Sequence, residues 1–127
     1  MVTRLTGKVK LVSGNRIVEV EALFDTGATK SFIDFSIAEK LGYVKYEKPR
    51  IVYLATKDTK AEIMGYVVAR VTIEDVELPL EHVFGVIKDL KHPCIIGMDI
   101  IEPYEIILDV KEGKIKFKKI PPTVEIV

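Results

Sequence analysis

Residues 22–29, Ala-Leu-Phe-Asp-Thr-Gly-Ala-Thr, include the side chain best suited to chemistry. An apolar run ends at Asp25, so the sequence predicts a carboxylate at the end of a buried strand. An ionised carboxylate is costly there unless backbone N–H groups or a partner satisfy it. These residues alone leave two interpretations open. Asp25 forms an ordinary Asp-x-Gly turn with its own backbone, or it acts as a catalytic carboxylate.

Peptide hydrolysis by carboxylates requires two of them, sharing one proton, because like charges about 3 Å apart cannot both ionise. One then acts as base on a water molecule while the other donates a proton to the substrate carbonyl. The chain carries a single Asp-Thr-Gly, so the second carboxylate has to come from a second copy of the chain. The chemistry therefore predicts a two-fold homodimer that brings Asp25 beside its symmetry mate.

Other reactive residue types lack partners at a useful spacing. His82 and His92 have no cysteine or carboxylate at ligand spacing, so we predict no metal. Cys94 is the only cysteine, which excludes a disulfide framework and favours a buried, unreactive thiol. The serines show no nucleophile elbow, and the chain has no glycine-rich phosphate loop.

Composition and charge indicate an ordinary soluble domain. The 127 residues are 48% apolar and carry 19 basic and 19 acidic side chains, so charge gives no reason to expect nucleic acid or a membrane as partner. Residues 1–20 resemble neither a signal peptide nor a membrane span, and we expect a cytoplasmic location. We interpret the basic cluster of Lys114, Lys116, Lys118 and Lys119 as a solvated strand face that deters edge pairing.

Alternating segments predict the elements that position Asp25. Residues 7–12 and 17–23 flank the turn signal Ser-Gly-Asn, which predicts a hairpin whose second strand ends at Asp25. Residues 29–33 are expected to continue extended. Asp34 can then cap a short helix over residues 35–41, with Gly42 just past its end.

The remaining chain predicts further short strands separated by turns. They are expected at residues 49–55, 61–66, 66–73, 76–80 and 82–87, with a last hairpin over 105–110 and 115–120. This pattern predicts an all-β fold, a small closed or nearly closed barrel with one or two short helices. We expect one domain over residues 1–120 and a C-terminal tail over 121–127.

Two separated signals resemble a known family. The first is hydrophobic-hydrophobic-Asp-Thr-Gly-Ala at residues 23–28, and the second is hydrophobic-hydrophobic-Gly at Ile95, Ile96 and Gly97, about seventy residues later. Together they resemble the retropepsin-like aspartic proteases of clan AA, single-domain relatives of pepsin. The resemblance implies an acid-protease barrel and a homodimeric endopeptidase that cuts peptides or unfolded protein without a cofactor. A non-proteolytic dimerisation or peptide-binding module with the same fold is the alternative.

The resemblance also implies a role for each residue of the motif. Asp25 is the expected catalytic carboxylate, Thr26 is expected to bond across the two-fold axis, and Gly27 lets the substrate backbone approach. Ala28 and Thr29 are expected to contact substrate. The resemblance implies that the strand at Ile95, Ile96 and Gly97 buttresses the active turn.

A hairpin at about residues 53–66 resembles the family's flap, a lid over bound peptide. It implies substrate contacts from Ala55, Thr56, Lys57, Asp58 and Thr59, with an inert exposed hairpin as the alternative. The sequence departs from retroviral members at Thr29 and Met98, where an acidic and a basic residue usually pair. Asp99 is expected to cap a helix over residues 100–102.

Overall fold

The computed structural model describes residues 1–53 and 60–124. In chain order the elements are β1 (Arg4–Ser13), β2 (Arg16–Asp25), β3 (Phe32–Asp34), α1 (Phe35–Leu41), β4 (Val44–Tyr53), β5 (Lys60–Ile73), β6 (Val76–Glu77), β7 (His82–Ile87), β8 (Cys94–Ile96), α2 (Met98–Ile101), β9 (Ile106–Asp109) and β10 (Lys114–Phe117).

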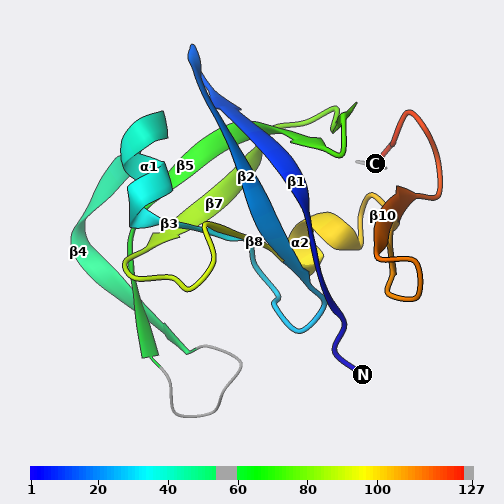
Figure 1. Cartoon of the computed structure of the whole chain (residues 1–127). Coiled ribbons are helices and arrows are strands. Elements are labelled where there is room, and N and C mark those ends of the chain that lie inside the picture. Colours follow the sequence, from blue (N-terminus) through cyan, green and yellow to red (C-terminus); the bar gives the residue numbers. More distant parts are fainter. Residues whose placement is uncertain (54–59, 125–127) are drawn as a thin grey trace.

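Six of the strands in the described part of the chain close into a barrel. Their order is β1-β2-β8-β3-β7-β5, and β5 pairs back onto β1. β4 and β6 extend from β5, and α1 packs against β2, β3, β5 and β7. β9 and β10 form a separate two-stranded sheet beside β1 (Figure 1). This mainly β architecture with short helices confirms the predicted fold class.

The first hairpin confirms its prediction. β1 and β2 pair antiparallel from Ser13 opposite Arg16 to Arg4 opposite Asp25. Gly14 adopts a φ of 60° at the turn, a conformation that costs other residues more. β2 ends at Asp25, as the apolar run indicated.

Helix α1 also confirms the sequence signals. The Asp34 carboxylate accepts a hydrogen bond from the Ser36 N–H at 3.0 Å, which caps the first turn. Gly42 follows the last turn with a φ of 78°. Because the helix has only seven residues, its stability depends on burying Ile37, Ala38 and Leu41 against the barrel.

Several strand predictions were wrong in extent. The strand expected from residue 49 begins earlier, at Val44. The segments expected at 61–66 and 66–73 form one fourteen-residue strand, β5. Only glycine fits at position 65 within this strand, because a Cβ there would stand 2.1 Å from the Val44 carbonyl oxygen of the neighbouring antiparallel strand β4. The strand expected at 76–80 is reduced to Val76–Glu77.

Buried apolar side chains from the barrel strands fill the interior. Phe24, Phe84 and Ile96 are fully buried there, as is Cys94. Cys94 is buried, as the sequence predicted, and burial raises the pKa of its thiol. No helix within residues 1–53 and 60–124 has the length and apolarity needed to cross a bilayer.

Candidate active site

Asp25 lies at the end of β2 and is nearly buried, at 8% exposure. Its Oδ1 accepts the Gly27 N–H at 2.8 Å, and its Oδ2 accepts the Nε–H of Arg4 at 3.1 Å. The Asp-x-Gly turn expected from the sequence is therefore present. Both carboxylate oxygens have a donor, which satisfies the cost of burying this group.

The face of β2 that carries Asp25 is the face turned away from the core. Ala22 and Phe24 are fully buried, so Leu23 and Asp25 point to the opposite side of the strand. Ile95 of β8 pairs in parallel with Leu23 and shares that side. Asp25, Leu23 and Ile95 consequently belong to one continuous surface.

Thr26 bonds within its own chain. Its Oγ1 accepts the Thr3 N–H at 2.7 Å, and its backbone N–H donates to the Thr3 carbonyl at 3.0 Å. At Gly27, an ideal Cβ would lie 3.0 Å from a methyl carbon of Val2. Residues 2–4, here called the N-terminal segment, thus run across all three residues of the motif.

The end of β8 packs tightly against the turn that follows the motif. Gly97 donates its N–H to the Ser31 Oγ at 2.9 Å, and Met98 donates to the Ala28 carbonyl at 2.7 Å. A Cβ on Gly97 would lie 2.5 Å from the Lys30 carbonyl oxygen and 2.8 Å from that of Ala28. Only glycine permits this approach without a backbone shift.

The prediction that Asp99 caps a helix was wrong. α2 begins after Gly97 without a side-chain cap. Instead, the Asp99 Oδ1 accepts the Ser31 hydroxyl at 2.7 Å and its Oδ2 accepts the Ser31 N–H at 3.1 Å. Ser31 therefore links Asp99 to Gly97, and this link supports the segment behind the Asp-Thr-Gly turn. The capping preference of Asp concealed it, because no local signal joins residues 68 positions apart.

Of the other residues expected to contact substrate, the structure describes Ala28 and Thr29. Ala28 is half-buried and donates its N–H to the Asp25 carbonyl at 3.1 Å, while Thr29 is exposed beside it. Ala55, Thr56, Lys57, Asp58 and Thr59 lie outside the described residues.

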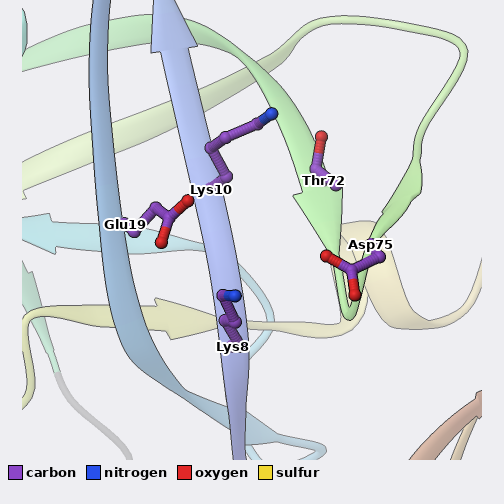
Figure 2. A pocket seen from close by; sticks show the side chains of 5 residues that line it. All are labelled: Lys8, Lys10, Glu19, Thr72 and Asp75. Atoms are coloured by element: carbon purple, nitrogen blue, oxygen red, sulfur yellow. The ribbon is translucent and has the colours of Figure 1, made fainter.

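A cavity of about 610 Å³ borders the surface shared by Asp25, Leu23 and Ile95, and Ile95 is the one residue of the three that lines it. Its lining comes from the start of β5 at residues 60–62, from residues 87–92 between β7 and β8, and from Ile95. This volume is in the range of sites for small ligands or a few side chains. A second hollow has a volume of about 40 Å³. Figure 2 shows the side chains that line it, those of Lys8, Lys10, Glu19, Thr72 and Asp75. It is too small for a peptide side chain.

Comparison with known proteins places these features in a family. A family model described as gag-polyprotein putative aspartyl protease matches residues 12–103. The chain belongs to this family. The match contains both the Asp-Thr-Gly turn and the Ile-Ile-Gly segment. No curated protein matches the sequence.

Solved structures of aspartic protease relatives share the fold. The retroviral protease-like domain of Ddi1 from Leishmania major has 21% identity and a TM-score of 0.64 over 95% of this chain and 94% of its own. A retropepsin-like aspartic protease from Rickettsia conorii has 21% identity and a TM-score of 0.55 over 86% of each chain. The retropepsin-like fold inferred from the motifs is confirmed.

In this chain, the segments around positions 29 and 98, where retroviral members usually pair an acidic with a basic residue, are held together in another way. Thr29 is exposed, and the Met98 N–H donates to the Ala28 carbonyl, while the Met98 side chain packs against the core. A neutral hydrogen bond thus holds the two segments together at this place. Its strength does not vary with the protonation of a side chain.

The two histidines have separate surroundings. The His82 Nε2 lies 2.6 Å from the Tyr104 hydroxyl, and burial lowers the pKa of His82 although the Asp99 and Glu81 carboxylates raise it. His92 lines the large cavity. In residues 1–53 and 60–124, no three His, Cys, Asp or Glu side chains gather in a way that could hold a metal ion.

Proposed function

We propose that the chain is a homodimeric aspartic endopeptidase that hydrolyses peptide bonds with a water molecule activated between Asp25 and Asp25 of a second copy. The observation that supports it best is the position of the Asp25 carboxylate. It ends a barrel strand, and it shares a surface with Ile95, which lines a cavity large enough for substrate side chains. Membership of an aspartyl protease family supports the same chemistry.

In the proposed reaction the two carboxylates share one proton. The ionised one takes a proton from water, whose oxygen forms a bond to the peptide carbonyl carbon. The protonated one gives its proton to the carbonyl oxygen. The resulting diol then collapses: the carboxylic acid formed in the first step gives its proton to the amide nitrogen, which leaves as an amine, and the other carboxylate takes a proton from one diol hydroxyl, whose oxygen becomes the carbonyl of the acid product. Gly27 lacks a side chain, so the substrate backbone can approach the carboxylates.

The proposed substrates are peptides or unfolded protein, and the reaction needs no cofactor. We also infer a cytoplasmic location, because the fold contains one cysteine, Cys94, and that thiol is buried and unpaired with any other.

A non-proteolytic dimerisation or peptide-binding module is the second candidate. The N-terminal segment favours it, since in the single chain Arg4 occupies one Asp25 oxygen and Thr3 occupies the Thr26 hydroxyl. Those contacts leave the motif engaged within its own subunit. A protease has to exchange at least the Arg4 contact for the symmetry mate.

The deciding experiment measures cleavage of an unfolded protein and a peptide library from acid to neutral pH. We expect the native chain to cleave, Asp25→Asn to be inactive, and Asp75→Asn to retain activity. Asp75 is a suitable control because it lies in an exposed turn with a φ of 69°, which Asn also tolerates. Equal turnover by Asp25→Asn removes the mechanism.

Sedimentation over a range of concentrations completes the test. A paired-carboxylate enzyme requires that activity per chain rise with the dimer fraction. A dimer that cleaves nothing supports the binding module, and a strict monomer with full activity overturns the shared-proton mechanism.

A further inference from the structure

The large cavity has an apolar floor that is continuous with the active turn. Ile87 pairs with Asp34, and Ile95 pairs with Phe32. Phe32 and Asp34 are two residues apart on β3 and so lie on the same face of the sheet, which places Ile87 and Ile95 on that face as well. Ile95 also pairs with Leu23, two residues before Asp25. A chain held at Asp25 can therefore extend over this floor.

Asp34 fixes the loop that forms one wall of the cavity. Its Oδ1 accepts the Leu90 N–H at 2.8 Å, and its own N–H donates to the Pro93 carbonyl at 3.0 Å. Burial acts to raise the pKa of Asp34, but hydrogen bonds from Ser36 and Leu90 outweigh it and lower the pKa. The carboxylate thus remains an ionised anchor, and the side chains flanking Leu90 project from a fixed backbone.

The rim of the cavity carries more positive than negative charge. Lys60, Lys88 and Lys91 line it, against Glu62 and Asp89. In the described part of the chain, the lysines found in ion pairs are Lys116 and Lys118 of the terminal hairpin. Lys88 and Lys91 are exposed, one on each side of Leu90. Their ammonium groups can therefore reach an incoming carboxylate.

We propose that this cavity selects acidic peptide segments. An apolar side chain covers Ile87 and Ile95, and a neighbouring Asp or Glu pairs with Lys88 and Lys91. The link to cleavage rests on the proposed function, whereas the binding preference does not, because every lining residue comes from one chain. Exposed ion pairs contribute modestly, so we expect an acidic residue to tighten binding about two- to five-fold.

The test measures binding to Asp25→Asn, which removes hydrolysis. The probes are three fluorescein-labelled, alanine-rich peptides that differ only in the residue beside a central leucine: glutamate, glutamine or lysine. Fluorescence anisotropy at low salt is expected to rank them glutamate, glutamine, lysine. Added salt should narrow the difference, because it screens exposed charges.

Charge reversal assigns the preference to the cavity. We expect Lys88→Glu with Lys91→Glu to invert the ranking, whereas Lys114→Glu with Lys119→Glu, an equal charge change at two exposed positions of the terminal hairpin, should preserve it. Equal binding of the three peptides, a preference unaffected by the Lys88 and Lys91 changes, or no binding of any peptide overturns the inference. Cleavage of the same peptides by the native chain tests the proposed function separately, so either idea can fail alone.

Discussion

The Nε of Arg4 lies 3.1 Å from the Oδ2 of Asp25, so the carboxylate at the centre of the motif is engaged within a single chain. The Arg4 side chain is 57% exposed, whereas that of Asp25 is 12% exposed. A guanidinium at this exposure can return to solvent at low cost. The Arg4–Asp25 ion pair can therefore break and re-form, and breaking it frees the Asp25 carboxylate for the proposed pair with its symmetry mate.

Arg4→Ala should raise activity at low protein concentration. Removing the guanidinium frees the Oδ2 of Asp25 for its symmetry mate, and an exposed ion pair of this kind corresponds to about two- to five-fold. Initial cleavage rates per chain, measured across a dilution series, check it. Arg16→Ala, at the far end of the same hairpin, should leave the rates unchanged. A lower rate for folded Arg4→Ala would show that Arg4 assists the reaction instead.

Gly97→Ala should disturb the active turn. Gly97 has an ordinary φ of −99°, so the strain is purely steric and comes from the Lys30 and Ala28 carbonyls. Overpacking of this kind costs about 1–3 kcal/mol. We expect a lower urea midpoint and reduced cleavage per folded molecule.

Gly14→Ala is the matched control for Gly97→Ala. Gly14 has no atom within 4 Å of an added Cβ, but its φ is 60°. This change should cost about 1–2 kcal/mol through backbone conformation alone. Cleavage per folded molecule should not change, because the β1–β2 turn is remote from Asp25. Equal loss of cleavage in both variants would contradict the role given to Gly97.

Asp99→Ala should destabilise the support behind the motif. It leaves the Ser31 N–H and hydroxyl without their acceptor, and Ser31 is 2% exposed, so we expect a loss of about 1–3 kcal/mol. Asp99→Asn retains one acceptor oxygen and should lose less. Urea unfolding in the Asp25→Asn background avoids self-cleavage. Glu39→Ala, exposed on α1, should stay within about 0.5 kcal/mol of its parent.

His82 should make stability depend on pH. Because burial lowers its pKa in the folded state, the unfolded chain binds more protons below the ordinary value of 6.5. The free energy of unfolding should be fully retained above that pH, fall as the pH drops from 6.5 toward the lowered pKa, and level off below it. Unfolding midpoints between pH about 7.5 and about 5 check this, and His82→Gln should show a smaller decrease over the same interval. An equal decrease in both proteins would exclude His82 as its source.

Local signals predicted the elements whose causes lie close together in the sequence. α1 is such a case, since its capping residue Asp34 and the terminating Gly42 bound the helix directly. Asp99 has the same capping residue type, yet its partner Ser31 is distant along the chain. A capping preference is a local property, and the closure of the barrel decides which distant hydrogen bond replaces it.

The contact between Arg4 and Asp25 was missed although the sequence contained a signal for it. A hairpin with a two-residue turn at Gly14 and Asn15 pairs Ser13 with Arg16, and the same register outward places Arg4 opposite Asp25. The basic cavity had no such signal. Residues 60–62 meet residues 87–92 only through the pairing of β5 with β7, which alternation within one strand cannot reveal.

The cavity is built entirely by one subunit, and the proposed two-fold axis would reproduce it on the opposite side of the dyad. A polypeptide bound across both copies of the cavity would contact Lys88 and Lys91 of one subunit before the scissile bond and those of the other subunit after it. The dimer has no direction of its own, whereas its substrate does. Preferred cleavage sites should then have acidic flanks on both sides, a palindromic charge pattern imposed on an asymmetric chain.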